Sequence, residues 1–169
     1  MATTYTLISS VTVGSGGAAN IEFTSIPATY TDLVMKISSR GTTTNALNGY
    51  YYDVIFNYES SNRSGRFLQK NDIYAQSAIY TLWGASSPSD FTASTFSNGE
   101  LYISNYASSN YKSSQLDSAN ENNATNNKKI VMSSGLWSNT AAITSITLVQ
   151  GGGNFAQYST AYLYGISNA

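Results

Sequence analysis

The stretch that decides the fold is residues 50–58, YYYDVIFNY, in which large side chains occupy every second position. Tyr52, Val54, Phe56 and Tyr58 share one face of an extended chain, because successive side chains of a strand point to opposite sides. The opposite face begins with Tyr51 and mixes apolar with polar residues. A strand with apolar residues on both faces is typically central in its sheet or covered by a partner.

The same alternation recurs along the whole chain, and no long stretch has a helical period. Strand candidates follow one another at intervals of about 10 to 20 residues with turn residues between them, which is typical of sandwiches. The sequence therefore predicts an all-β fold, an antiparallel β-sandwich of jelly-roll type with about 8–10 strands. We expect a single domain over residues 1–169, with residues 1–4 as a candidate N-terminal arm.

Two patterns in the first hundred residues give local expectations. Tyr5, Leu7, Val11 and Val13 fall on one face of the first strand by simple alternation. The dipeptide at 98–99, Asn-Gly, tolerates positive φ and favours a tight hairpin.

The turns, the remaining strand candidates and the polar stretches give further local expectations. Residues 14–17, GSGG, and 62–65, NRSG, are expected to form turns, and residues 73–84 are expected to form one strand. The polar span 107–129 contains at most one weak strand near residues 113–118, followed by a long loop at 120–127.

Composition excludes much of the catalytic repertoire. The chain of 169 residues contains no Cys and no His, and only 10% of its residues are charged. Thiol nucleophiles, disulfides, imidazole bases and the zinc or haem sites built from these ligands are therefore excluded. The net charge of −1 without a basic stripe argues against nucleic acid as a partner, and no apolar run is long enough to cross a membrane. We expect no catalytic residues, no metal site and no cofactor.

Three patterns resemble chemical motifs but have simpler explanations. Residues 14–19, GSGGAA, match a relaxed dinucleotide fingerprint, yet a strand pattern follows where a helix is needed, so a glycine hairpin is favoured. Residues 109–112, SNYK, match Ser-x-x-Lys, as expected by chance in a serine-rich chain. Asp117, Glu121 and Asn122 could supply oxygen ligands to calcium, but a solvated loop explains them as well.

A glycoside hydrolase is the enzymatic alternative, since it needs only two carboxylates. The spacing of the acidic residues selects no pair, and each fits a solvent-facing position on a strand or turn. The chain is therefore expected not to be an enzyme.

The 14 tyrosines are the positive signal, because a tyrosine offers a large apolar ring and a hydroxyl that tolerates water. Core packing, a subunit interface and a glycan site are all compatible with such residues. The candidate interface residues are Tyr50, Tyr51, Tyr52, Trp83 and Trp137, and the two tryptophans also suit the core.

Four segments together resemble a group of small virion proteins of tailed bacteriophages, especially cyanophages. They are residues 21–33 (IEFTSIPATYTDL), 101–106 (LYISNY), 135–148 (GLWSNTAAITSITL) and 153–166 (GNFAQYSTAYLYGI). The resemblance implies a capsid cement or decoration protein on the outer surface of the virion. Such a protein would associate with itself and clamp adjacent copies of the major capsid protein. We expect a homotrimer, with a dimer as the alternative. The alternative is a receptor-binding or glycan-binding domain of a tail fibre or tailspike.

Overall fold

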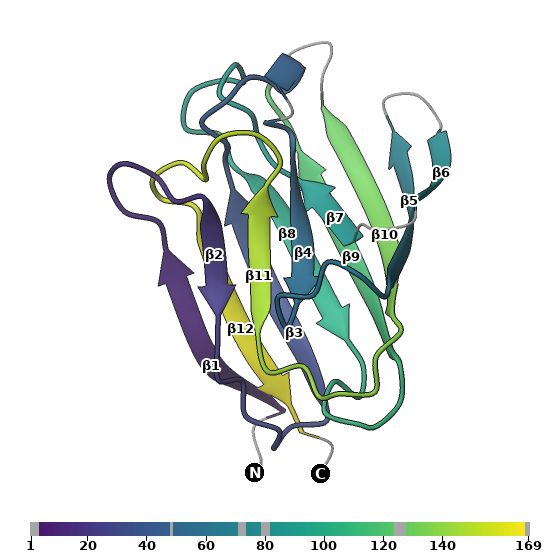
Figure 1. Cartoon of the computed structure of the whole chain (residues 1–169). Coiled ribbons are helices and arrows are strands. Elements are labelled where there is room, and N and C mark those ends of the chain that lie inside the picture. Colours follow the sequence, from purple (N-terminus) through teal and green to yellow (C-terminus); the bar gives the residue numbers. More distant parts are fainter. Residues whose placement is uncertain (1–3, 48, 71–73, 79–81, 124–127, 168–169) are drawn as a thin grey trace.

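The computed structural model describes residues 4–47, 49–70, 74–78, 82–123 and 128–167 (Figure 1). Within these ranges twelve strands make up almost all regular structure, and the only helix there is the short 3-10 turn η1 (Asn45–Leu47). The first six strands are β1 (Tyr5–Thr12), β2 (Asn20–Phe23), β3 (Asp32–Ser39), β4 (Tyr51–Phe56), β5 (Arg63–Lys70) and β6 (Tyr74–Ala78). The other six are β7 (Leu82–Ala85), β8 (Ser97–Ile103), β9 (Lys112–Asn120), β10 (Lys129–Trp137), β11 (Ile146–Gln150) and β12 (Thr160–Ile166).

The strands form two antiparallel sheets that pack face to face. The large sheet has eight strands in the order β1-β12-β3-β8-β9-β10-β5-β6, and the small sheet has four in the order β2-β11-β4-β7. The predicted all-β sandwich is therefore confirmed. The strand at residues 50–58, expected to be central in its sheet or covered by a partner, is central, because β4 lies between β11 and β7.

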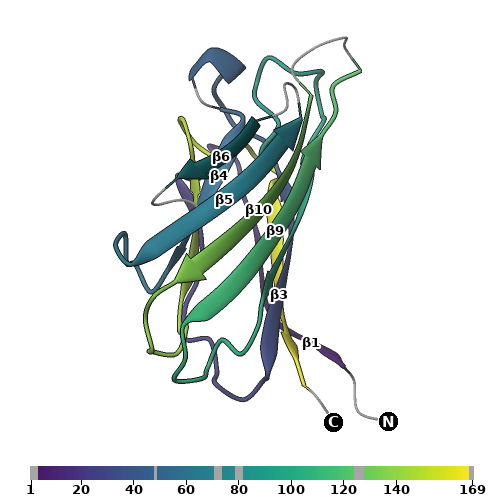
Figure 2. The same cartoon turned by 90° about the vertical axis from the view of Figure 1, so that its right-hand side faces the viewer.

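Eight strands follow a jelly-roll path. The chain alternates between the sheets through β1, β2, β3 and β4, and again through β7, β8, β11 and β12. The resulting four-strand sets, β1-β12-β3-β8 and β2-β11-β4-β7, are the two halves of a jelly roll. The pairs β5–β6 and β9–β10 are insertions that extend the large sheet beyond β8, as Figure 2 shows for β9, β10, β5 and β6.

Apolar side chains from both sheets meet in one core. From the large sheet come Leu33, Leu101 and Leu163, and from the small sheet come Ile21, Val54 and Leu148, all at most 1% exposed. Full burial of an aliphatic side chain of this kind contributes roughly 1.5–3 kcal/mol. The six residues alternate with outward-facing ones along their strands, as the period of two requires.

The large sheet curls around the edge strand β7 of the small sheet. Ser133 Oγ on β10 donates to the carbonyl of Trp83 at 2.7 Å, and the amide of Ala85 donates to Ser118 Oγ on β9 at 2.8 Å. The ring of Phe67 on β5 packs edge-on against Trp83, with ring centroids 4.5 Å apart. Side chains of the large sheet thus satisfy and cover the backbone edge of β7.

The first strand corrects the predicted face assignment. Tyr5 and Leu7 point away from the core and are 53% and 52% exposed, whereas Val11 packs partly buried against it. A β-bulge between Leu7 and Ser9 shifts the register against β12 by one residue. Because side chains alternate with period two, one extra residue exchanges the faces, so simple alternation was wrong here.

Two predicted turns are strands instead. Residues 98–99 lie inside β8, paired with β3 and β9, so the predicted hairpin is wrong. In the predicted turn at 62–65, residues 63–65 are instead the first three residues of β5. In contrast, the predicted turn at residues 14–17 is confirmed, with the Gly17 amide donating to the Gly14 carbonyl at 3.3 Å. That turn joins β1 to β2 in the other sheet, so it is a link between sheets and not a hairpin.

The middle of the chain holds more strands than the sequence predicted. Residues 73–84 do not form one strand, because β6 belongs to the large sheet and β7 to the small one. The weak strand predicted near residues 113–118 is the nine-residue β9. Most of the predicted arm at 1–4 and residues 124–127 of the predicted loop lie outside the described residues.

Candidate functional site

The outer face of the large sheet, the side that points away from the small sheet, gathers the exposed apolar side chains. Among the described residues, eight of the eleven large apolar side chains that are exposed lie on it. They are Tyr5, Leu7, Leu68, Tyr102, Ile130, Met132, Leu136 and Tyr162. The other three belong to connections between strands. This face is therefore the candidate functional site.

One half of the outer face is a tyrosine cluster, formed by Tyr5, Leu7, Tyr102, Tyr162 and Tyr164. The strand register sets Leu7 beside Tyr164, Tyr164 beside Val34, and Val34 beside Tyr102. The rings of Tyr5 and Tyr164 meet edge to face with centroids 6.3 Å apart. Val34 on β3 lies between Tyr164 on β12 and Tyr102 on β8. It is only 1% exposed although its side chain is on the outer face. The cluster therefore forms a continuous apolar surface that carries hydroxyl groups.

A hydrogen bond fixes one tyrosine of this cluster. The Tyr102 hydroxyl donates to Asp32 Oδ2 at 2.7 Å, and Asp32 Oδ1 accepts the amide of Asn105 at 2.8 Å. The bond to Asp32 and partial burial raise the pKa of Tyr102 to about 12. The ring of Tyr102 is thus held in one orientation at the surface by a carboxylate anchored to the backbone.

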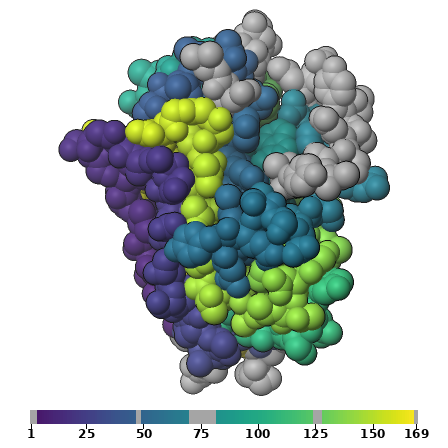
Figure 3. All heavy atoms as spheres, viewed as in Figure 1, coloured from purple at the N-terminus to yellow at the C-terminus, as the bar shows by residue number. Residues whose placement is uncertain are grey.

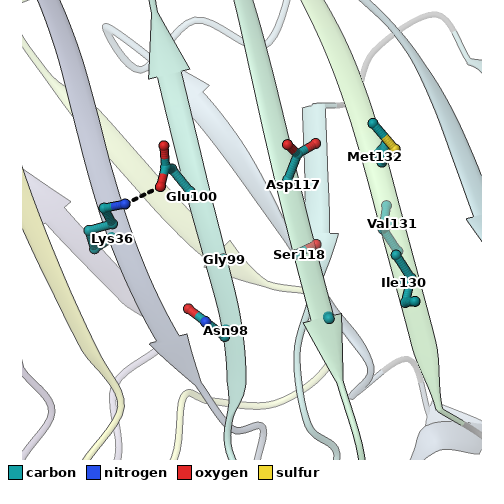
Figure 4. Close-up of a pocket in the computed structure, with 10 residues that line it drawn as sticks. Lys36, Asn98, Gly99, Glu100, Asp117, Ser118, Ile130, Val131 and Met132 are labelled. Carbon is teal, nitrogen blue, oxygen red and sulfur yellow. Dashed lines mark hydrogen bonds and ion pairs between the residues drawn. The ribbon is translucent and has the colours of Figure 1, made fainter.

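A charged strip runs across the middle of the outer face (Figure 4). The register aligns Lys36 on β3 with Glu100 on β8 and Asp117 on β9. Lys36 and Glu100 form an ion pair in which both side chains are about half exposed, and Gln115 Nε2 donates to Asp117 Oδ2 at 3.1 Å. An exposed pair of this kind contributes at most about 1 kcal/mol to stability.

The other half of the outer face is an aliphatic cluster, formed by Leu68, Ile130, Met132 and Leu136. Met132 lies directly opposite Leu68 in the pairing of β10 with β5. Ile130 and Met132 also line a shallow hollow of about 340 Å³, whose opposite wall is the charged strip (Figure 4). A second hollow, of about 330 Å³, lies between Arg66 and Leu136. The outer face thus offers two apolar areas with charged groups between them.

The sequence-predicted interface residues lie elsewhere. Tyr52 and Trp137 are 0% and 1% exposed and belong to the core between the sheets. Trp83 is 9% exposed and is enclosed by Tyr51 and Phe67. In this structure these three side chains offer no open surface, because the space between and around the sheets needs large rings to fill it.

Tyr50 and Tyr51 are half-buried at the end of the small sheet where β4 begins. Their rings lie 5.3 Å apart, and Lys129 Nζ sits 3.2 Å from the centre of the Tyr50 ring. Burial lowers the pKa of Lys129 to about 8. Of the five predicted residues, these two are the ones with part of their surface open to a partner.

Sequence reasoning missed the residues of the outer face. The β-bulge hides Tyr5 and Leu7, because alternation assigned them to the face of Val11. Ile130 and Met132 are hidden differently, since β10 carries apolar residues on both faces and alternation cannot say which one is covered. Only the packing of the two sheets shows which of the two apolar faces of β10 is left uncovered.

The segments that resemble a dinucleotide fingerprint, a Ser-x-x-Lys motif and a calcium loop have structural explanations. Strand β2 follows residues 14–19, so no helix N-terminus exists there to hold a pyrophosphate. Lys112, the lysine of the Ser-x-x-Lys match, is fully buried. It donates to the backbone carbonyls of Ser108, at 2.7 Å, and Asn139, at 3.4 Å. Glu121 accepts the amides of Asn122 and Asn123. Within the described ranges, no group of three or more Asp, Glu, His or Cys side chains is placed to hold a metal ion.

No family model matches the chain, and no curated protein matches its sequence. Across the described part of the chain, no helix has the length and apolar character to span a membrane.

Proposed function

We propose that this chain is a non-enzymatic structural protein of a bacteriophage particle, a cement or decoration protein on the outer surface of the capsid. It binds adjacent copies of the major capsid protein through the outer face of the large sheet. The observation that carries the proposal is the concentration of eight exposed large apolar side chains on that one face. The resemblance of four segments to small phage virion proteins supports the same assignment.

The composition of the face suits protein contact. Contiguous apolar areas with a few charges between them are typical of interaction surfaces, and tyrosine and methionine are enriched at such surfaces. The charged strip at Lys36, Glu100 and Asp117 would fix the register of a partner, because an unmatched charge buried in an interface is costly.

A cement protein acts by mass action. A subunit that binds only the assembled shell stabilises that shell by its binding free energy, repeated over all copies. Self-association of the subunit adds avidity, since two linked binding faces engage neighbouring capsid subunits together. The homotrimer stays a prediction, with a dimer as its alternative.

A glycan-binding domain of a tail fibre is the second candidate, and the Tyr102–Asp32 pair favours it. Carbohydrate sites combine aromatic rings with fixed carboxylates, and Tyr102, held by Asp32, lies across β3 from Tyr162 and Tyr164. Copy number separates the candidates. Heads and tails of purified phage particles that contain the chain would be separated, and the chain would be counted against the major capsid protein by mass spectrometry.

A copy number near that of the major capsid protein, found in the head fraction, supports the cement role. A few copies, confined to the tail, would overturn it in favour of the glycan-binding role. Met132→Asp should abolish rebinding of the chain to heads that lack this protein. On binding, the new carboxylate would be buried in the aliphatic cluster without a partner. Asn20→Asp, which adds the same charge at an exposed position of β2 in the small sheet, is the matched control and should leave rebinding unchanged.

A further inference from the structure

Strand β1 is a long sheet edge without the usual protection. Its eight residues, YTLISSVT, include no charged residue and no proline, and the first charged residue of the chain is Glu22. An edge of this kind presents a row of backbone N–H and C=O groups that can pair with another strand. Native monomers usually block such an edge with a charge, a proline or a covering segment.

Both edges of the small sheet, β2 and β7, are protected, in contrast to β1 at the edge of the large sheet. The edge of β7 is satisfied by the hydroxyls of Ser118 and Ser133. Strand β2 has only four residues and carries the charged Glu22, which is exposed. By contrast, within the described part of the chain the backbone of residues 5–12 has hydrogen-bonding partners only in β12. Residues of β1 and β2 form one margin of the molecule, purple in Figure 3.

The side-chain pattern of β1 is symmetric about its own centre. The bulge between Leu7 and Ser9 puts Tyr5, Leu7, Ser10 and Thr12 on the outer face, opposite Ile166, Tyr164, Tyr162 and Thr160 of β12. These four positions map onto one another when the strand is reversed about the point between Ile8 and Ser9. A reversed copy of β1 would therefore bring outward residues against outward residues along its whole length.

We propose that two copies of this chain pair β1 to β1, antiparallel, across a two-fold axis between Ile8 and Ser9. Leu7 of each copy then lies opposite Ser10 of the other, and Tyr5 opposite Thr12. The pairing joins the two large sheets into one continuous sheet and brings the two tyrosine clusters together on one face. It closes with two copies, because the same edge is used by both. The pairing is a property of the chain alone and does not rest on the proposed virion role.

The test is the mass of the full chain in solution, measured by sedimentation or by light scattering after size exclusion. We expect twice the 18.1 kDa of one chain. The double variant Leu7→Lys, Ser10→Lys sets lysine against lysine at both Leu7–Ser10 contacts and should give the mass of one chain. Both positions are exposed, so the fold of the single chain should be kept, which circular dichroism checks.

The matched control is Leu7→Lys, Ser10→Glu, which sets lysine against glutamate at the same contacts. This variant should keep the double mass. A wild-type chain that stays single at its highest soluble concentration, or that forms a trimer, would overturn the pairing. So would a lysine–lysine variant that keeps the double mass, or a lysine–glutamate variant that loses it.

Cysteine cross-linking tests the register separately, since the chain has no native cysteine. Protein with Leu7→Cys, mixed with protein with Ser10→Cys, should form a disulfide-linked pair under mild oxidation. Leu7→Cys alone should not, because its two copies lie too far apart along the strands for a disulfide. Efficient cross-linking of Leu7→Cys alone would contradict the proposed axis.

Discussion

The hydroxyl of Tyr52 in the small sheet ends against Gly99 in the large sheet. A Cβ atom built on Gly99 would lie 2.5 Å from that hydroxyl oxygen, closer than real Cβ contacts come. Gly84, next to Tyr52 in the small sheet, faces the same hydroxyl. Tyr52 is fully buried, and its hydroxyl has no hydrogen-bonding partner among the described residues. Glycine at position 99 thus makes space for a ring from the opposite sheet.

Gly99→Ala should destabilise the fold by about 1–3 kcal/mol, because the added methyl group overpacks the core against Tyr52. The same change in the variant Tyr52→Phe should cost less, since the colliding hydroxyl is gone. Chemical unfolding of the four proteins in this double-mutant cycle measures the coupling. Gly14→Ala is the control, because a Cβ at Gly14 meets nothing within 4 Å. Equal costs in both backgrounds would contradict the contact.

Arg40 holds the connection between β7 and β8. Its guanidinium donates to the backbone carbonyls of Ser89, Phe91, Thr92 and Thr95 at 2.8–3.0 Å. We expect Arg40→Lys to destabilise the protein by about 2 kcal/mol or more, because one ammonium cannot reach this set of carbonyls and hydrogen bonds to charged groups contribute about 1.5–3 kcal/mol each. Hydrogen exchange of residues 89–95 should become faster, and unchanged exchange there would refute the role.

Glu59 links the β4–β5 connection to the end of β10. Its carboxylate accepts hydrogen bonds from the indole N–H of Trp137 at 2.8 Å and from the side-chain Nδ2 of Asn139 at 3.0 Å. The pKa of Glu59 is held below its usual 4.5 mainly by the side-chain hydrogen bond from Asn139, followed by the one from Asn62. The ionised form therefore stabilises the fold above pH 4.5, and this contribution is lost as the pH falls through the folded-state pKa.

Glu59→Gln should be less stable than the wild type at neutral pH, and the difference should shrink in acid below pH 4.5. Urea unfolding at a series of pH values measures both. Glu22→Gln, an exposed substitution on β2, is the control. A stability difference that stays constant with pH would show that the charge of Glu59 is not involved.

The contribution of Asp53 to stability depends on pH in the opposite direction from that of Glu59. It lies 3.5 Å from Arg63, but burial outweighs this attraction and raises the pKa of Asp53 from 3.8 to about 6. Folding favours the protonated acid, so its contribution is full below pH 3.8 and is lost as the pH rises to about 6. The stability of the wild type relative to Asp53→Asn should fall over this interval by up to about 3 kcal/mol. A flat difference from pH 3.5 to 7 would contradict the shift.

The polar strand β9 explains why the sequence predicted too few strands. Its inward side chains include Ser114, Ser118 and Asn120, which give no hydrophobic alternation. Ser118 and Asn120 are buried because they face the backbone of β7 and the residue after it. Ser118 Oγ accepts the Ala85 amide, and Asn120 Nδ2 donates to the Ser86 carbonyl at 2.7 Å. A strand whose inward partner is another strand's backbone cannot be found from hydrophobicity alone.

The sequence by itself determined that this protein is an antiparallel jelly-roll sandwich, because alternation with period two and the turns between strands are local properties of the chain. The tertiary structure decided which apolar face is covered and which is open. At Tyr5 and Leu7 one bulged residue exchanges the faces, and at β10 both faces are apolar. Whether such a face is buried depends on which distant strand lies over it, and that is fixed only when the two sheets pack. The open outer face of the large sheet and the edge position of β1, where we propose that partners bind, follow from that packing.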